Sequence, residues 1–391
     1  MRVLQYCQHV LGIGHFVRSL EIARALHPHM VVFVEGGNPV QGVSYPNNVE
    51  IIRLPPLEMD TEFRGFTVRD DELPAIQEHR KKALLDICRS FRPDVFLIEL
   101  FPFGRKKFRF ELIPAIEFFR ATSPDTLIVC SMRDILVEKE NQQKYEARVL
   151  EVLNKYFDLL LVHSDPRLIK LDDTFSRVKD IAVPLEYTGF VVRKPGGVKG
   201  RRKTRRAVGR NLVRIVASNG GGRVGGEVLE MVVRAMDRLG KGYHLDLFPG
   251  PFMEREEKKK LLELAKNRPT VSIHKFSKNF VDELRNADIS ISMAGYNTMM
   301  DLVASGTPGL VLPFGQNREQ MLRAQKFAER GVVRILKSLD PDTIATEIQN
   351  MVNNPPVRDK DADFKMNGAE KTKQILEKYV QAVKRHEASR E

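Results

Sequence analysis

Short apolar runs alternate with longer amphipathic stretches along this chain, and the alternation occurs twice. In the first half, β-branched or leucine-rich runs typical of buried strands occupy residues 2–6, 31–34, 95–98, 127–129 and 159–162. Apolar side chains at helical spacing lie between them, in residues 16–26, 73–91 and 142–156. Strands that alternate with helices predict a doubly wound parallel sheet of the α/β class.

The same pattern restarts in the second half of the chain. Strand-like runs occupy residues 214–217, 244–248, 271–274, 289–292 and 309–312. The sequence therefore predicts two Rossmann-like domains that face each other across a cleft. The expected divisions are a first domain at 1–190, a basic linker at 191–213, a second domain at 214–355 and a polar tail at 356–391. A helix at 369–385 in that tail could dock back on the first domain.

The charge of the chain is concentrated in one segment. The formal net charge is +12 over 391 residues, and residues 193–214 hold ten lysines and arginines with no acidic residue. A solvated linker is the simplest interpretation. Contact with acidic lipid headgroups or an anionic acceptor is the sharper alternative, and nucleic acid is the least favoured partner.

Cysteine content and apolar runs bear on the compartment. The three cysteines are widely spaced, which favours neither a disulfide framework nor a zinc site. The first residues are expected to form a strand rather than a signal peptide, and no apolar run approaches the roughly 18 residues of a membrane span. We expect a cytoplasmic protein, with residues 193–214 as the route to any peripheral contact at the inner face of the membrane.

Ligands of open parallel sheets bind beyond the carboxyl ends of the strands, so the loop after the first strand is a candidate site. It contains Gly12, Gly14 and His15 where a helix is expected to start. The positive end of a helix dipole disfavours imidazolium, so a histidine there can stay neutral and accept a proton. A capping or packed histidine is the alternative.

The corresponding loop of the second half is richer in glycine. Residues 218–226 contain five glycines between an expected strand and the helix at 227–239. Backbone N–H groups, the helix dipole and Arg223 could together hold a diphosphate. The loop lacks the Lys-Ser/Thr ending of a P-loop, and a flexible surface turn is the alternative.

A further strand, glycine turn and helix lie at residues 292–320. Gly295 would let a ligand approach the helix that follows, and Asp301 could accept both hydroxyls of a ribose. Glu319 and Gln320 are expected at the rim, where they could bind sugar hydroxyls. A solvated position on the helix surface is the alternative for Asp301.

These motifs resemble glycosyltransferase family 28, whose members have the GT-B fold. The Ala-Gly-Tyr-Asn-Thr sequence at 294–298, Asp301, and residues 306–308, 313–314 and 318–320 are similar to the donor-binding segment of that family. The glycine-bearing loops at 12–15 and 218–226 fall in the same order. The whole chain, including residues 98–105 and 130–134, looks most like uncharacterised bacterial proteins described as predicted glycosyltransferases.

The resemblance implies roles for individual residues. The donor side would comprise Asn219, Gly220, Gly221, Gly222, Arg223, Phe276, Ser277, Phe280, Gly295, Tyr296, Asn297, Thr298, Asp301, Glu319 and Gln320. The acceptor-side loops would comprise Gly12, Gly14, Arg105 and Arg133, with His15 at the acceptor. Asp301 is one methylene shorter than the glutamate usual in the family, and residues 100–103 and 133–134 do not match the acceptor loops of the family's peptidoglycan enzyme.

The expected chemistry is in-line displacement with inversion from a nucleotide-diphosphate sugar, with UDP as the expected nucleotide. His15 is the favoured base, and Glu99 or Asp134 is the orienting partner or the base itself. Helix N–H groups would stabilise the leaving diphosphate, so no metal or other cofactor is expected, and Asp361 and Asp363 are interpreted as solvated.

Two other functions share the same architecture. A nucleotide-sugar 2-epimerase would convert the donor without an acceptor, and a non-catalytic nucleotide or nucleic-acid binding protein would use residues 193–214. The acceptor, which could be lipid-linked or anionic, and the sugar stay open.

Overall fold

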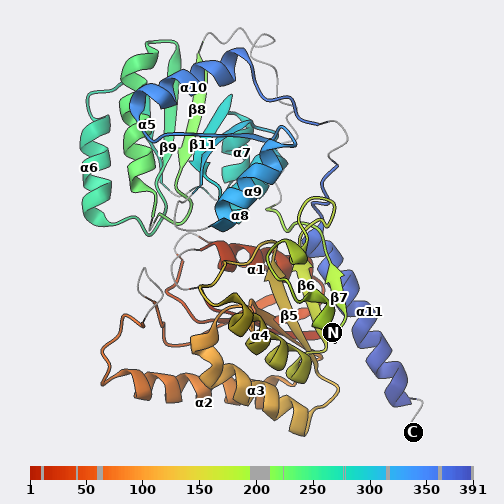
Figure 1. The fold of residues 1–391 in the computed structure, drawn as a ribbon. Helices are drawn as coiled ribbons and strands as arrows, with labels where there is room; N and C mark the ends of the chain where they lie inside the picture. The colour runs from red at the N-terminus through yellow and green to blue at the C-terminus, as the bar shows by residue number, and fades with distance from the viewer. Residues whose placement is uncertain are drawn as a thin grey trace.

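The computed structural model describes residues 1–9, 13–40, 43–59, 65–193, 212–222, 224–275, 277, 279–313, 318–359 and 363–388. These residues form two parallel sheets, one in each half of the chain. The halves lie one above the other in Figure 1, with α1 (Gly14–Ala25) on the side of the first half that faces the second.

The N-terminal sheet has seven strands in the order β3-β2-β1-β4-β5-β6-β7 among the described residues. Their bounds are β1 (Arg2–Cys7), β2 (Met30–Glu35), β3 (Val49–Arg53), β4 (Val95–Glu99), β5 (Leu127–Arg133), β6 (Leu159–His163) and β7 (Leu185–Tyr187). All neighbours are parallel, and β1 lies between β2 and β4, with Leu4 opposite Val32 and Phe96. The strand order reverses at β1, which is where ligands bind in folds of this kind.

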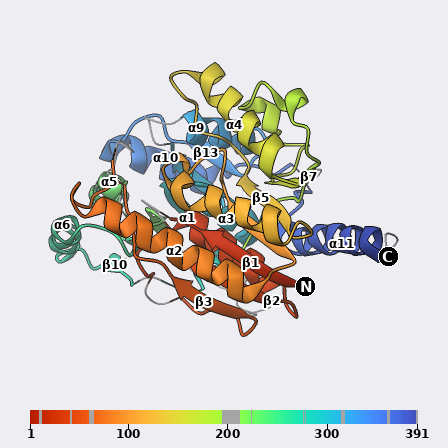
Figure 2. The ribbon, with the colours of Figure 1, turned by 90° about the horizontal axis from the view of Figure 1, so that it is seen from below.

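Helices cover both faces of the N-terminal sheet. One face packs against α2 (Leu73–Phe91), α3 (Arg109–Thr122) and α4 (Gln142–Tyr156). Figure 2 shows α2 and α3 lying across that face in the view from below. The other face packs against α1 and α11 (Gly368–Ala388). The described residues of this half also form short 3₁₀ turns at η1 (Lys106–Phe108), η2 (Leu171–Asp173) and η3 (Val178–Asp180).

The C-terminal sheet repeats the topology with six described strands, in the order β10-β9-β8-β11-β12-β13. Their bounds are β8 (Val213–Ser218), β9 (Tyr243–Phe248), β10 (Val271–Ile273), β11 (Ile289–Met293), β12 (Gly309–Leu312) and β13 (Val333–Ile335). The helices of this half are α5 (Gly226–Leu239), α6 (Arg255–Ala265), α7 (Phe280–Arg285), α8 (Tyr296–Ser305), α9 (Arg318–Ala328) and α10 (Pro341–Asn353). The predicted class, two Rossmann-like α/β halves, is confirmed.

The last helix belongs spatially to the first half. Helix α11 follows the C-terminal sheet in the chain, yet it packs against α1 through a buried row formed by Ala369, Ile375, Leu376 and Val380. Figure 1 shows α11 running along the side of the N-terminal half, below the C-terminal half. The chain therefore passes between the halves twice.

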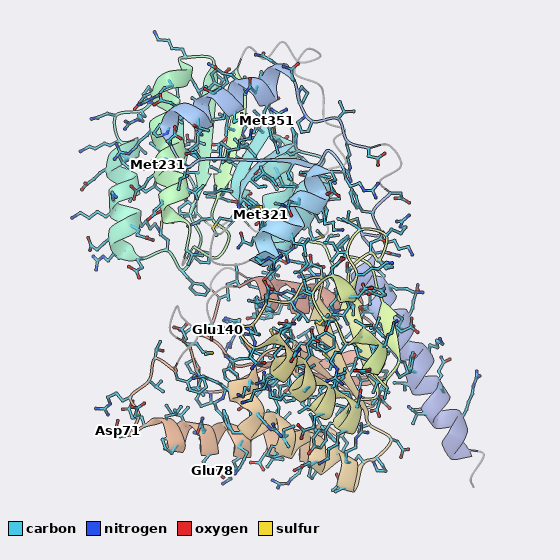
Figure 3. The ribbon with its side chains drawn as sticks, viewed as in Figure 1. Asp71, Glu78, Glu140, Met231, Met321 and Met351 are labelled. Atoms are coloured by element: carbon cyan, nitrogen blue, oxygen red, sulfur yellow. The ribbon has the colours of Figure 1, made fainter. Side chains whose placement is uncertain are left out.

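The outer and inner sides of the molecule are distinguished in Figure 3. Asp71 and Glu78 lie by α2, on the side of the N-terminal half that is remote from the other half, whereas Met321 and Glu140 lie near the boundary between the halves.

Among the described helices, none combines the length and apolar character that crossing a bilayer would require.

Candidate active site

A cavity of about 930 Å³ lies between the two halves. Its walls come from segments that follow β1, β4 and β5 on one side and β8, β9 and β11 on the other. Because every strand is parallel to its neighbours, the carboxyl ends of both sheets open into this one space. The cavity is therefore where a ligand could contact both halves at once.

His15 and Glu99 form a pair in the wall of the N-terminal half. His15 lies at the start of α1, Glu99 ends the adjacent strand β4, and His15 Nδ1 is 2.5 Å from Glu99 Oε1. The carboxylate can only accept, so Nδ1 carries the proton and donates it. Nε2 makes no hydrogen bond to a described residue, and its lone pair is free to accept a proton from a ligand.

The protonation states of His15 and Glu99 suit a hydrogen bond from the imidazole to the carboxylate. Burial lowers the pKa of His15 to about 3, against the raising effect of Glu99. The pKa of Glu99 is lowered to about 2, because His15, Arg105 and Arg18 together outweigh the raising effect of its burial. A neutral imidazole held by an ionised carboxylate is the form that a general base requires.

Arginines surround the buried carboxylate of Glu99. Arg18 lies one turn after His15 on α1 and donates to Glu99 Oε1 at 2.6 Å. Arg105 Nη2 is 3.7 Å from Oε2 of the same group. The sequence analysis did not single out Arg18, although its spacing of three residues from His15 placed both on one face of a helix.

Asp134 occupies a different environment from the predicted one. It is fully buried and forms a two-pronged ion pair with Arg323 of α9, at 2.7 and 2.8 Å. It does not line the cavity. The prediction that Asp134 orients or replaces the base therefore requires correction: a carboxylate closed off by a buried guanidinium joins the two halves and has no access to a ligand.

The glycine-rich loop follows β8 at the opposite wall. Asn219, Gly220 and Gly221 line the cavity. Asn219 Oδ1 accepts a hydrogen bond from the backbone N–H of Gly250 at 2.8 Å, which ties this loop to the one after β9. Gly222 supports the loop from behind, where a Cβ would lie 2.7 Å from backbone atoms of Gly250.

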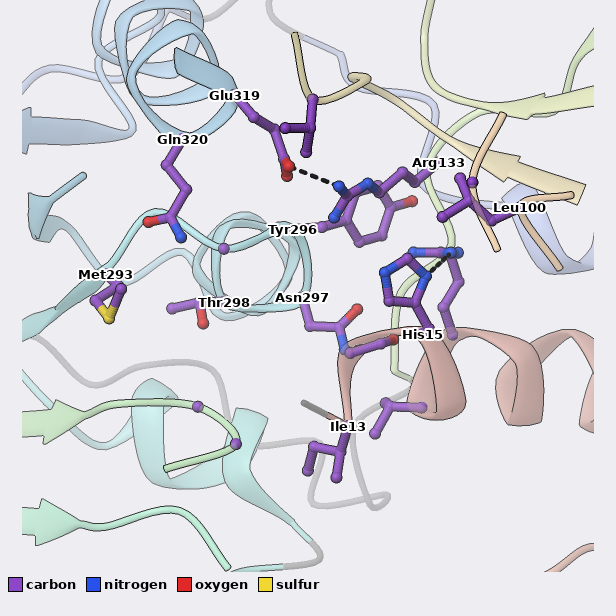
Figure 4. A pocket seen from close by; sticks show the side chains of 18 of the residues that line it. Ile13, His15, Leu100, Arg133, Met293, Tyr296, Asn297, Thr298, Glu319 and Gln320 are labelled. Carbon is purple, nitrogen blue, oxygen red and sulfur yellow. Dashed lines mark hydrogen bonds and ion pairs between the residues drawn. The ribbon is translucent and has the colours of Figure 1, made fainter. Parts of the chain in front are cut away.

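Helix α8 starts opposite α1. Tyr296, Asn297 and Thr298 line the cavity from its first turn, and Gly295 is the N-cap residue. Asn297 Nδ2 donates to the carbonyl oxygen of Gly14 at 3.1 Å, so the N-termini of the two helices meet. Figure 4 shows Asn297 pointing toward the helix that carries His15.

Asp301 lies one turn further along α8 and also lines the cavity. Its carboxylate is 3% exposed and is paired with Arg193, whose Nε donates to Oδ1 at 3.1 Å. Burial raises the pKa of Asp301, against the lowering effect of Arg193. The sequence analysis treated Arg193 only as part of the basic segment, and no sequence signal linked it to Asp301.

The remaining predicted donor residues form the rim. Ser277 and Phe280 line the cavity, and the Phe280 ring packs edge-on against Phe248 with centroids 5.3 Å apart. Glu319 and Gln320, at the start of α9, also line it. Glu319 accepts from Arg133 Nη2 at 2.6 Å, and this bond crosses from one half to the other (Figure 4).

Several predictions lie outside the described residues. They concern Gly12, Arg223, Phe276, Asp361 and residues 194–211. Asp363 is described, and its carbonyl oxygen accepts from Arg167. Within the part of the chain that the structure describes, no three histidine, cysteine, aspartate or glutamate side chains gather as a metal site would require.

Comparisons with known proteins find a family match in the second half of the chain. The glycosyltransferase family 28 C-terminal domain matches residues 221–379. A UDP-N-acetylglucosamine–N-acetylmuramyl-(pentapeptide) pyrophosphoryl-undecaprenol N-acetylglucosamine transferase of Bacillus cytotoxicus is 24% identical over 167 residues, which is 42% of this chain and 45% of that relative. The chain thus matches less than half the length of this relative.

Solved structures are similar over nearly the whole chain. MurG of Acinetobacter baumannii superposes with a TM-score of 0.56 and 13% identity, over 98% of this chain and 99% of that one. A putative UDP-N-acetylglucosamine 2-epimerase of Listeria monocytogenes gives 0.58 and 10% identity, over 96% and 90%. The predicted resemblance is confirmed: the chain has the GT-B fold and carries a glycosyltransferase family 28 C-terminal domain.

Proposed function

We propose that this protein is an inverting glycosyltransferase that moves a sugar from a nucleotide-diphosphate donor, UDP-linked, to a hydroxyl acceptor. The observation that carries the proposal is the pair of His15 and Glu99, which presents a free Nε2 toward a cavity whose opposite wall is the family 28 domain. In a binding protein without catalysis, nothing would require a neutral histidine held in one tautomer at that place.

His15 acts as the general base in this proposal. Nε2 accepts the proton of the acceptor hydroxyl while the oxygen attacks the anomeric carbon, and the nucleoside diphosphate leaves from the opposite side. The imidazolium that forms is stabilised by Glu99, whose carboxylate stays ionised among Arg18 and Arg105. Attack and departure on opposite sides invert the anomeric configuration.

The departing diphosphate needs positive potential, which the C-terminal half can supply. The loop at Gly220 and Gly221 brings backbone N–H groups to the cavity, and α5 and α8 begin beside it. Helix N-termini and backbone N–H groups are a common site for phosphate. This set of donors supports a mechanism that does not depend on a metal ion.

The nucleoside portion is proposed to lie between Asp301 and the rim residues Ser277 and Phe280. Asp301 would accept the ribose hydroxyls once Arg193 yields one or both of its bonds, and the freed guanidinium would then lie near the diphosphate. Glu319, Gln320 and Thr298 are proposed to contact the sugar.

The first experiment is thermal stabilisation of the protein by uridine, thymidine, guanosine and adenosine diphosphates and their sugars. A ligand at about 100 times its dissociation constant should stabilise by roughly 2.7 kcal/mol. We expect one nucleotide to stabilise selectively, and Asp301→Ala to abolish its effect. Asp86→Ala, an exposed change on α2, is the matched control and should retain it.

Product analysis then separates transfer from other reactions. With the stabilising nucleotide-sugar and an extract of small hydroxyl compounds, release of nucleoside diphosphate with a glycosylated product of inverted anomeric configuration is expected. Conversion of the donor to its C2 epimer would instead identify an epimerase. No stabilisation by any nucleotide would contradict the donor site.

A further inference from the structure

The charges around the cavity are strongly unbalanced. Among the described residues, eight cationic side chains line it and only two carboxylates do. The carboxylates are Asp301 and Glu319. Seven of the eight cations come from the N-terminal half, which is the proposed acceptor side: Arg18, Arg105, Lys106, Lys107, Arg133, Lys139 and Arg148.

Ion pairing inside the protein does not account for this excess. Arg18, Arg105 and Arg133 each have a carboxylate partner, as described above. Lys106, Lys139 and Arg148 form no ion pair with a described carboxylate. Glu138 and Glu140 flank Lys139 in the chain, but Glu138 pairs with Arg318 and neither lines the cavity.

Arg105 is the most constrained member of the group. Its side chain is only 8% exposed, yet its Nε and Nη2 atoms have no hydrogen-bond partner within the described structure. Its backbone has φ 59°, a conformation that non-glycine residues seldom adopt and that the surrounding loop must enforce. The ion pair with Glu99, at 3.7 Å, leaves these two donors without a hydrogen bond, so the guanidinium keeps the capacity to bind an anion in the cavity.

Arg133, Lys139 and Arg148 form a second part of the same surface. Lys139 is an exposed residue, but partial desolvation beside the cavity lowers its pKa, and the charges of Arg133 and Arg148 lower it further, so the three lie close enough to repel one another. Arg148 also lies 5.7 Å from the ring centre of Tyr145, whose hydroxyl donates to the carbonyl oxygen of Phe103 at 2.7 Å. That bond joins the loop carrying Arg105 to the helix carrying Arg148.

The geometry points to an acceptor that bears a phosphate group beside its reacting hydroxyl, bound by Arg105, Lys139 and Arg148. This inference rests on the proposed function, because it assigns the acceptor side of that site. Phosphate matches the cluster because it offers several acceptor oxygens and up to two negative charges to two guanidinium groups and an amine. Apolar walls formed by Phe103, Leu136 and Val137 adjoin the cluster.

This phosphate position is separate from that of the donor diphosphate. The glycine-rich loop belongs to the C-terminal half, whereas the three cations lie just before η1, on the connection after β5 and on α4 of the N-terminal half. Saturating the donor site with nucleoside diphosphate should therefore leave the cationic cluster able to bind a second anion.

The test titrates inorganic phosphate into protein saturated with the nucleoside diphosphate that the stabilisation panel identifies, using calorimetry. We expect phosphate to bind without displacing the nucleotide, and Lys139→Gln combined with Arg148→Gln to weaken it at least about 10-fold. Lys144→Gln, an exposed change on the same helix outside the cavity, should change nothing. Arg105→Gln should weaken phosphate binding in the same direction.

Phosphate that only competes with the nucleotide, or that binds the double variant as well as the unmodified protein, would overturn the inference. Two further titrations, of farnesyl phosphate against farnesol in detergent, identify the source of the phosphate. Tighter binding of farnesyl phosphate than of inorganic phosphate indicates a lipid-linked acceptor, and equal binding indicates a water-soluble one. A protein that binds phosphate but no nucleotide would contradict the proposed function alone.

Discussion

His15 and Glu99 are separated by 84 positions in the chain, yet His15 Nδ1 lies 2.5 Å from Glu99 Oε1 in the wall of the N-terminal half. Their proximity follows from sheet topology, since β1 and β4 are neighbours and both residues follow or end those strands. A base placed in this way is rigid, because the helix start and the strand end are both fixed by the core. The protonation state of His15 is therefore set by burial and by the fixed charges around the ring.

The pH dependence of the reaction should reveal this state. Since burial lowers the pKa of His15 to about 3, well below its ordinary 6.5, the imidazole takes up a proton only as the pH falls far below neutral. We expect kcat/KM, measured with the donor identified above, to keep its plateau below pH 6.5. His15→Ala should lower kcat by about 10²- to 10⁴-fold while nucleotide stabilisation persists.

Glu99→Gln provides the companion variant. It keeps the size of the side chain but removes the charge that stabilises the imidazolium, so kcat should fall while the nucleotide still binds. An acid limb at or above pH 6.5 in the unmodified protein, or full activity in His15→Ala, would exclude His15 as the base.

The sequence identified these side chains only in part. His15 and Glu99 could be placed together because the ends of adjacent strands can be inferred from the order of the strands. Asp134 could not be assigned correctly, because its partner Arg323 lies in the other half. The pairing of Arg193 with Asp301 could not be predicted either, because the two residues are 108 positions apart in the chain.

At the scale of elements, the shape of the glycine-rich loop depends on two backbone segments that lie against each other. Gly222 has φ 92° and lies against Gly250, and a Cβ on Gly250 would come within 2.2 Å of the Gly222 nitrogen. Neither position has room for a side chain. The shape of the loop therefore depends on contact with the turn after β9 as well as on its own sequence.

Gly222→Ala should disturb both stability and nucleotide binding. The positive φ alone costs about 1–3 kcal/mol for a residue with a side chain, and the close contact with Gly250 adds to that cost. Gly306→Ala is the control, since Gly306 has φ 72° at the end of α8 with open space around it. Urea unfolding and the nucleotide-induced thermal shift measure the two effects.

We expect Gly222→Ala to be the more destabilised variant and to lose most of its nucleotide shift. Gly306→Ala should lose stability but still respond to nucleotide. An equal response of both variants to nucleotide would mean that the loop is not part of the donor site.

Sequence patterning predicted the central strands, the edge strand β10 and about half of the described helices, but it missed the other edge strands. Strand β3 has charged residues at Glu50 and Arg53, and β7 and β13 are three residues long, so none has a long apolar run. Helix α3 contains Pro114, which weakened its helical pattern. Edge strands are recognised by their pairing with neighbours, which a local pattern does not contain.

At the scale of the molecule, side chains join the two halves around the cavity. Arg323 of α9 pairs with Asp134, Arg133 pairs with Glu319, and the hydroxyl of Tyr296 donates to the carbonyl oxygen of His163 at 3.2 Å. The pair of Arg323 and Asp134 is fully buried, and such a pair is costly to separate unless both partners find new ones. The halves are therefore held in register as well as joined by the chain.

Leu376→Ala tests how much α11 contributes to the N-terminal half. Leu376 is fully buried in the core shared with α1, and removing its side chain should cost about 2–5 kcal/mol. The measurement is denaturant unfolding. Gln374→Ala, an exposed change on the same helix, should stay within about 0.5 kcal/mol of the unmodified protein. A similarly small loss for Leu376→Ala would mean that α11 is only loosely docked.

The position of α11 also has a consequence for biosynthesis. The helix is translated after the C-terminal half, yet it covers one face of the sheet of the N-terminal half. On the ribosome, the apolar surface of α1 that α11 covers must stay open to solvent until the whole C-terminal half has emerged. Nascent chains that stall within the C-terminal half would present that surface to chaperones or to one another, whereas a chain that has emerged as far as α11 could bury it.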